Sequence, residues 1–300
     1  MGGDDGAPRI GFKRVYPAAD FDGFEPALEA FLAEALRAGA DLPRRGAIAF
    51  AGPIDAQAGR LVNRSSWAVD REMLRRLGID ARLVNDFHAL AEGVAQAAPH
   101  DYEVLQQGTQ VPGGTVALVG AGTGLGVASL AWDGRRYRPV PSEAGHMSFA
   151  PHSETELALL RHLAALHGRV SAERIVSGHG IAAIYEFLRT PGAPAADPAQ
   201  ISRNAVVDPG SIEGKVLDLF IRCYGGFAGD IALAFLSRGG VYIGGGIAAK
   251  LAGRFRQGDF MAAFLDKGRH RALVGAMPVR LVTNESLGLL GAARIALAPD

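Results

Sequence analysis

The sequence is poor in cysteine, in net charge and in long apolar runs. Cys223 is the single cysteine, so no internal disulfide can form, and a structural zinc site built from several thiolates is excluded. Lysine plus arginine equals aspartate plus glutamate, 31 against 31, so no overall field attracts nucleic acid or an anionic membrane. Charges or glycines interrupt the longest apolar stretches, and the first residues lack the features of a signal peptide. We therefore expect a cytoplasmic protein that binds neither nucleic acid nor a membrane.

The chain is long and apolar enough for two domains. It has 300 residues, of which 48% are hydrophobic, and this share suffices to bury a sizeable core. Apolar runs of strand character alternate with helical periodicity, which favours a mostly parallel sheet with helices on its faces. The polar, turn-rich stretch 99–114 is typical of a connection between domains. We expect a small domain of residues 1–96 and 287–300, and a large domain of residues 97–286.

Periodicity and turn signals predict the individual elements. The stretch 211–237 is apolar nearly all round, so it should form a buried helix. Its Gly225, Gly226 and Gly229 should let another backbone approach closely. Asp133-Gly134 indicates a hairpin turn. The other expected helices are 24–37, 69–77, 86–98, 154–167, 180–190 and 287–298, and the expected strands are 9–16, 46–52, 60–63, 82–84, 115–119, 127–132, 240–243 and 280–283.

Two glycine-rich segments are candidates for binding phosphates. Gly120–Gly126 lies between two apolar strands, and its backbone amides, with the Thr123 hydroxyl, can form an anion-binding nest. It is not a dinucleotide fingerprint, because Leu125 stands where the third glycine belongs, and no P-loop motif occurs in the sequence. Gly244–Gly246 follow a strand and precede a helix, which suits an anion or a nucleotide lying against the backbone. Taken alone, the first segment equally fits a glycine-rich hairpin, and the second a tight strand-to-helix turn.

Polar side chains follow strands or lie in loops at three further places. Asn85 and Asp86 follow an apolar strand, where ligands bind in open α/β sheets, so Asp86 is a candidate general base. Both residues are also good helix N-caps. Glu143 and His146 lie three residues apart in a loop, which fits hydrogen bonds to neighbouring sugar hydroxyls and also fits an ordinary turn. Glu173 fits the acidic first turn of a helix.

The order of these pieces along the chain resembles that of the bacterial glucokinase family. The match runs from about Arg9 to about Ala298, and the ordered set is specific although each motif is modest. The resemblance implies a two-domain α/β protein with the actin-like ATPase (ribonuclease H-like) sugar-kinase fold. In chain order the matching motifs are Gly52-Pro53-Ile54, Asn63–Trp67, Asn85-Asp86-Phe87, Gly120–Gly126, Glu143 with His146, Phe149-Ala150-Pro151, Ser171–Arg174 with Ser177-Gly178, Gly244–Gly246, Phe264–Arg269 and Gly288–Gly291.

The resemblance also implies an activity, the transfer of a phosphoryl group from ATP to the 6-hydroxyl of glucose. Such transfer needs positioning and charge neutralisation, with Mg²⁺ bridging the phosphates. Asp86 would accept the proton of the hydroxyl, and no metal-ligating residue of the protein is expected. A homodimer is a candidate assembly. The implied ligand residues are Asn85, Glu143, His146 and Glu173 for the sugar, Gly122, Thr123, Gly124 and Gly126 for the ATP phosphates, and Gly244, Gly245 and Gly246 for the adenosine.

One part of the family pattern is missing from the sequence as given. The family begins with a strand, a G-D-x-G-G-T turn and a second strand, whereas Gly2-Gly3-Asp4 has no strand before it. The expectation is a small domain without its first hairpin, a half-built phosphate site and weak kinase activity. Two alternatives stay open beside glucose phosphorylation: a sugar-binding or regulatory relative with impaired catalysis, and a kinase for another hexose.

Overall fold

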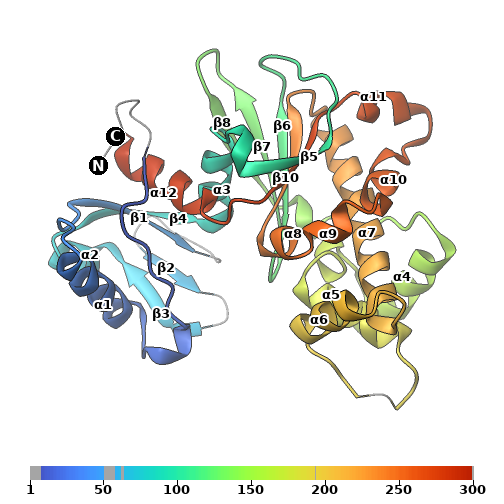
Figure 1. Ribbon diagram of the computed structural model, residues 1–300, viewed down its shortest axis with the longest axis horizontal. Helices are drawn as coiled ribbons and strands as arrows, with labels where there is room; N and C mark the ends of the chain where they lie inside the picture. Colours follow the sequence, from blue (N-terminus) through green and yellow to red (C-terminus); the bar gives the residue numbers. More distant parts are fainter. Residues whose placement is uncertain (1–7, 51–57, 62–63, 193, 299–300) are drawn as a thin grey trace. The chain divides into compact units, whose positions relative to one another are not determined.

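The chain divides into two compact units, each built around strands covered by helices (Figure 1). The first unit is Met1–Gln96 with Ser286–Asp300, and the second is Ala97–Glu285. The computed structural model describes residues 8–50, 58–61, 64–192 and 194–298. The motifs at Gly2–Asp4, Gly52–Ile54 and Asn63 lie outside the described residues. In the described part of the chain, no helix is long and apolar enough to cross a membrane.

A parallel pair of strands organises the first unit. Strands β1 (Arg45–Phe50) and β4 (Asp80–Asn85) run parallel in continuous register, and β2 (Ala58–Leu61) pairs antiparallel with β3 (Arg64–Asp70). Buried side chains of α1, β1, β3, α2 and β4 form one apolar core. The helices of this unit are η1 (Ala18–Asp20), α1 (Phe24–Arg37), α2 (Arg71–Arg76), α3 (Asp86–Val94) and α12 (Leu287–Leu297).

The closing helix α12 packs against α3 through glycines. A Cβ atom at Gly93 would collide with the carbonyl of Leu287, and one at Gly291 would collide with the carbonyl of Ala89. The two backbones can approach this closely only because neither glycine carries a side chain. The contact fixes α3, whose first residue is Asp86.

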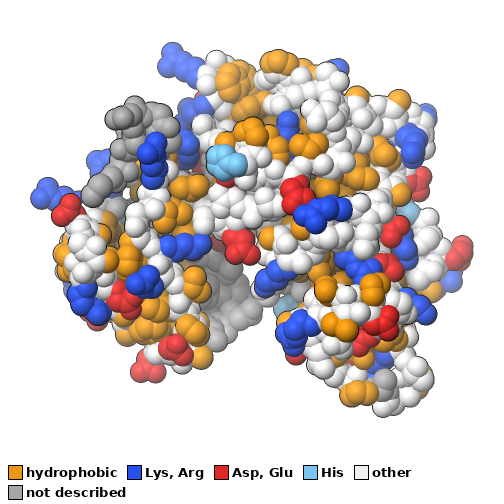
Figure 2. All heavy atoms as spheres, viewed as in Figure 1, with side chains coloured by type: hydrophobic (Ala, Val, Ile, Leu, Met, Phe, Trp, Pro, Cys, Tyr) orange, Lys and Arg blue, Asp and Glu red, His pale blue; other side chains and the backbone are white. Residues whose placement is uncertain are grey.

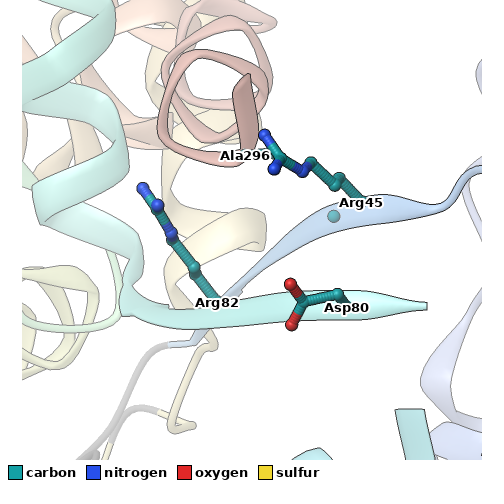
Figure 3. Close-up of a pocket in the computed structure, with 5 residues that line it drawn as sticks. Arg45, Asp80, Arg82 and Ala296 are labelled. Atoms are coloured by element: carbon teal, nitrogen blue, oxygen red, sulfur yellow. The ribbon is translucent and has the colours of Figure 1, made fainter. Parts of the chain in front are cut away.

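Arg82 of β4 also binds the C-terminal end of α12, and its side chain lines the pocket drawn in Figure 3. Its Nη1 donates to the carbonyl of Ile295 at 2.9 Å, and its Nη2 donates to the carbonyl of Ala298 at 3.0 Å. These are carbonyls at the C-terminal end of a helix, which cations stabilise. The pocket therefore lies at a helix-capping contact and contains none of the predicted ligand residues. It is lined by Arg45, Gly46, Asp80, Arg82 and Ala296.

A six-stranded mixed sheet forms the centre of the second unit. Its strand order is β5-β10-β9-β6-β7-β8. β9 pairs in parallel with β10 and β6, while the other neighbours are antiparallel. The expectation of a mostly parallel sheet is wrong for this unit, because tight turns connect β6, β7 and β8. The strands are β5 (Tyr102–Gln106), β6 (Val116–Ala121), β7 (Leu125–Trp132), β8 (Tyr137–Ser142), β9 (Gly240–Gly244) and β10 (Val279–Val282).

The edge strand β8 carries two prolines. Pro139 lies opposite Leu130, and Pro141 lies opposite Ala128. Proline has no amide hydrogen, so in a sheet it is tolerated where the nitrogen faces away from the partner strand. The hairpin turn expected at Asp133-Gly134 is confirmed, since it joins β7 to β8.

Helices cover this sheet, and the long helix α7 (Ile212–Ala234) is the most deeply buried of them. Its buried residues join those of β6, β9 and β10 in one large apolar core. This confirms the expectation of a helix that is buried nearly all round. The other helices of the unit are η2 (Pro99–Asp101), η3 (Ala144–His146), α4 (Glu154–His167), η4 (Ala172–Arg174), α5 (Gly178–Leu188), α6 (Pro198–Val207), α8 (Gly246–Lys250), α9 (Ala252–Phe255), α10 (Asp259–Leu265), η5 (Gly268–His270) and α11 (Arg271–Gly275).

Helix α10 approaches α7 at its small residues. A Cβ atom at Gly225 would collide with the carbonyl of Phe260, and one at Gly229 would lie 2.5 Å from the carbonyl of Phe264. We therefore expect Gly225→Ala to lower the free energy of unfolding by about 1–3 kcal/mol, because the helices must move apart. Gly253→Ala is the matched control, because a Cβ atom at this helical position has open space. This variant should raise the free energy of unfolding by about 0.4–1 kcal/mol. Urea denaturation measures both, and an unchanged midpoint for Gly225→Ala would contradict the close contact.

Several expected elements differ from the observed ones. Residues 9–16 form no strand, and the connection 99–114 contains β5. The helix expected from residue 69 begins at Arg71, because the Asp70 carboxylate caps it by accepting from the Met73 amide at 2.6 Å.

On the face shown in Figure 2, basic and acidic side chains are interspersed, in keeping with the equal totals of 31 and 31.

Candidate active site

The first glycine segment forms the tight loop of the β6–β7 hairpin. The ladder extends to the pair Ala121 and Leu125, so Gly122, Thr123 and Gly124 make up the whole loop. The Gly122 amide donates to the Gly124 carbonyl at 2.8 Å. A Cβ atom at Gly122 would meet nothing within 4 Å, so the space above this residue is open to a ligand. Gly126 lies beyond the loop, in the β7 ladder opposite Gly120.

The N-terminus of α5 lies directly against this loop. The Gly178 amide donates to the Gly122 carbonyl at 2.8 Å, and His179 Nδ1 lies 3.2 Å from the Thr123 carbonyl oxygen. Ser177 caps the helix by accepting from the Gly180 amide at 3.1 Å. A helix N-terminus carries partial positive charge, which favours a phosphate nearby. The motif Ser177-Gly178 indicates a helix N-terminus in the sequence, but no local pattern predicts that this terminus contacts the glycine loop.

The second glycine segment lies beside the first. Gly120 pairs with Gly244, the last residue of β9, and Gly246 begins α8. Gly245 has φ +86°, and a Cβ atom there would collide with the Ala121 carbonyl. Both its backbone angle and its surroundings therefore require glycine. The parallel pairing of β6 with β9 thus brings together two segments that lie far apart in the sequence, Gly122–Gly124 and Gly244–Gly246.

Glu143, His146 and Glu173 form a cluster of side chains next to the loop. His146 Nε2 lies 3.7 Å from Glu143 Oε2, and His146 Nδ1 lies 3.7 Å from Glu173 Oε1. The other Glu173 oxygen, Oε2, accepts from the Leu125 amide at 2.9 Å, and a Cβ atom at Gly124 would lie 2.6 Å from it. Glu173 therefore contacts both the imidazole and the base of the glycine loop.

Backbone bonds hold the two short helices that carry this cluster. The Ala172 amide donates to the Met147 carbonyl at 2.8 Å, and the Phe149 amide donates to the Val170 carbonyl at 3.0 Å. Gly145 packs η3 onto β7, since a Cβ atom there would collide with the Leu125 carbonyl. The side chain of Glu143 remains 92% exposed, and that of His146 remains 55% exposed. The cluster is thus rigid at its backbone and open at its polar tips, as a ligand site requires.

Asn85 and Asp86 occupy the end of β4 and the start of α3 in the first unit. Asn85 Oδ1 accepts from the amides of Phe87 at 2.9 Å and His88 at 3.2 Å, so Asn85 is the N-cap of α3. Asp86 Oδ1 accepts from the Phe87 amide at 2.8 Å. Desolvation raises the pKa of the Asp86 carboxyl, and the Phe87 amide opposes this shift. The residue is still exposed, so the surrounding protein partly desolvates its carboxylate without excluding a ligand.

The described residues provide no cage for a resident metal ion. Among them, no group of three or more histidine, cysteine, aspartate or glutamate residues is placed to hold one. Mg²⁺ in kinase sites keeps several waters and is bound by one or two carboxylates together with the substrate phosphates.

Two solved glucokinase structures share this architecture. The glucokinase of an Antarctic psychrotroph aligns with a TM-score of 0.82 and 30% identity, over 99% of this chain and 92% of that chain. A ROK family glucokinase from Streptomyces griseus, in complex with glucose and AMPPNP, aligns with a TM-score of 0.57 and 20% identity, over 91% and 86%. The predicted class, a sugar kinase of the actin-like ATPase fold, is confirmed.

Sequence comparison narrows this class to one family. The glucokinase family model matches residues 4–299. The glucokinase of Nostoc punctiforme is 38% identical over 309 residues, covering 94% of this chain and 89% of that protein. The chain belongs to the glucokinase family.

Proposed function

We propose that the chain transfers the γ-phosphoryl group of ATP to the 6-hydroxyl of glucose. The observation that carries this proposal is the position of Glu173, which contacts His146 with one oxygen and the base of the glycine loop with the other. A group of hydroxyl-binding side chains is thereby attached to a loop with open space for phosphate. Glucokinase relatives over nearly the whole chain support the same reaction.

Each predicted residue takes a chemical role in this proposal. Asp86 accepts the proton of the attacking hydroxyl, and the raised pKa of its carboxyl brings it closer to a useful general base. Asn85, Glu143, His146 and Glu173 bind the remaining hydroxyls. The amides around Gly122–Gly124 and the N-terminus of α5 bind the phosphates, which satisfies developing charge with groups that are already oriented.

The remaining ATP residues belong to the second glycine segment. Gly244, Gly245 and Gly246 lie beside the adenosine, with open space above Gly246, and Gly126 supports the hairpin from within β7. Mg²⁺ enters as part of the MgATP substrate and neutralises phosphate charge. A homodimer in the cytoplasm is the proposed setting.

Variants of the exposed cluster should separate sugar binding from nucleotide binding. Glu143→Gln and His146→Ala each remove a polar partner of a sugar hydroxyl, which is worth about 0.5–3 kcal/mol. We expect glucose to bind about 2–150-fold more weakly, with little change for ATP. Calorimetric titration with each ligand measures this, and equal losses for both ligands would contradict the assignment.

The activity itself is tested with the purified chain, MgATP and single hexoses. Product is followed by coupling glucose 6-phosphate to a dehydrogenase, or by ADP release for other sugars. Turnover that requires both glucose and ATP supports the proposal. Glucose binding without product would favour the sugar-binding relative, and faster ADP release with another hexose would favour a kinase of that sugar.

A further inference from the structure

The hydroxyl of Tyr224 lies between the ends of the two strands that carry the glycine segments. It donates to the Val119 carbonyl at 3.1 Å and accepts from the Ala121 amide at 3.1 Å. The Gly244 carbonyl oxygen of β9 is 3.5 Å away. The paired register of β6 with β9 ends at Gly120 and Gly244. The hydroxyl therefore replaces a ladder bond at the point where the two strands diverge into the loops.

The ring of Tyr224 cannot move away from this position. Tyr224 is fully buried in α7. Its ring packs edge-on against three phenylalanine rings, with centroid distances of 6.0 Å to Phe220, 5.7 Å to Phe255 and 5.7 Å to Phe260. Such packing leaves the hydroxyl one location, because core side chains interdigitate at crystal-like density.

Ala121 transmits this constraint to both glycine segments. It is fully buried and directly precedes Gly122 of the hairpin loop. Gly245 packs against its backbone so closely that any Cβ atom would collide. Without the hydroxyl, the Ala121 amide would be a buried donor without its partner, which native structures avoid. Relief would require Ala121 to shift, and the two glycine segments would shift with it.

We propose that Tyr224 is a positioning residue for ATP, which sets the spacing between the loop that binds the phosphates and the turn beside the adenosine. This inference rests on the proposed roles of the two glycine segments. Tyr224 reaches no ligand itself, since its hydroxyl is enclosed by backbone groups of β6 and β9. Its effect on ATP passes through the backbone that its hydroxyl meets, at Val119 and Ala121 of β6 and at Gly244 of β9.

The test compares three variants of the full chain by steady-state kinetics and urea denaturation. Tyr224→Phe removes only the hydroxyl and keeps the packed ring. Tyr185→Phe is the matched control, because Tyr185 is also buried and its hydroxyl donates to the Pro194 carbonyl at 3.5 Å, away from the glycine segments. Gly245→Ala disturbs the second segment directly and tests the proposed nucleotide site.

For Tyr224→Phe we expect the KM for ATP to rise about tenfold, the size of effect that one lost hydrogen bond can produce. The KM for glucose should stay within twofold of the parent, at a temperature where denaturation shows the variant to be folded. Tyr185→Phe should leave both constants unchanged. A tyrosine with a merely structural role would lower the denaturation midpoint and leave the KM for ATP alone.

The outcomes separate the two proposals. A changed KM for ATP in Gly245→Ala with an unchanged one in Tyr224→Phe overturns the positioning role and leaves the nucleotide site standing. Unchanged ATP constants in both variants overturn the nucleotide site and the positioning role together. Equal increases in KM for glucose and ATP in Tyr224→Phe also overturn the inference, because the disturbance would then be general.

Discussion

Replacing Asp86 by asparagine is expected to lower kcat by about 10²–10⁴-fold, the usual contribution of a general base. Glucose binding should persist, because the asparagine side chain has nearly the same shape and can still bond a hydroxyl. Asp80→Asn, at the opposite end of the same strand, is the matched control and should retain full activity. Coupled assays and glucose titration measure the two effects. A kcat within a few-fold of the parent would remove Asp86 from the mechanism.

The pH dependence of the parent enzyme gives a second measure of the same group. A base must be ionised to accept a proton, so kcat should fall as pH drops through the pKa of Asp86. Desolvation raises that pKa, so the fall should begin above the range of an ordinary aspartate, which titrates near pH 4. Asp86→Asn should abolish this limb of the profile in whatever activity remains.

The free energy of unfolding of Asp86→Asn should show that the loss of kcat is not caused by misfolding. A carboxyl whose folded-state pKa is raised favours folding when protonated, and it loses that contribution as pH rises through the folded-state pKa. At neutral pH the ionised Asp86 carboxylate is destabilised by desolvation, and asparagine removes this cost. Asparagine also removes a negative charge from the first turn of α3, which that helix terminus favours. The two effects oppose each other, so the denaturation midpoint should change little while kcat collapses.

Glu173→Ala is expected to weaken the binding of both glucose and ATP, whereas the variants of Glu143 and His146 should weaken the binding of glucose alone. The substitution removes a proposed sugar ligand and also the acceptor of the Leu125 amide at the base of the glycine loop. Each loss costs about 1–3 kcal/mol when a buried partner is left unpaired. Glucose and ATP should therefore each bind about 5–150-fold more weakly, as calorimetry with the separate ligands would show.

Two comparisons make this result specific to the position of Glu173. Glu173→Gln keeps an oxygen that can accept from Leu125, so ATP binding should recover while glucose binding stays weak. Glu186→Ala removes an exposed carboxylate of α5 that pairs with Arg189 at 2.6 Å, and it should change neither affinity. If Glu173→Ala weakened the binding of glucose but not of ATP, the contact between Glu173 and the glycine loop would play no part in ATP binding.

Local signals in the sequence predicted much of the fold, but they could not predict contacts between distant segments. Helices α1 and α4 have the expected bounds, because each combines apolar periodicity with clear ends. β5 was missed within a polar connection, since its strand character depends on pairing with β10. The chain order of motifs indicated the family and the candidate ligand residues, whereas the spacing of His146, Glu173 and Leu125 depends on tertiary structure. No local pattern marked Tyr224, whose role depends on the two strand ends that its hydroxyl meets.

The prolines of β8 have a consequence for self-association. An exposed strand normally offers a row of amide donors to which another chain can add a strand. At Pro139 and Pro141 the outer side of β8 has no donor to offer, so a second copy cannot extend the sheet there. We therefore expect no second copy to add a strand beside these two residues. β8 keeps its register with β7 through both prolines, so the two residues limit strand addition at this edge without interrupting the sheet.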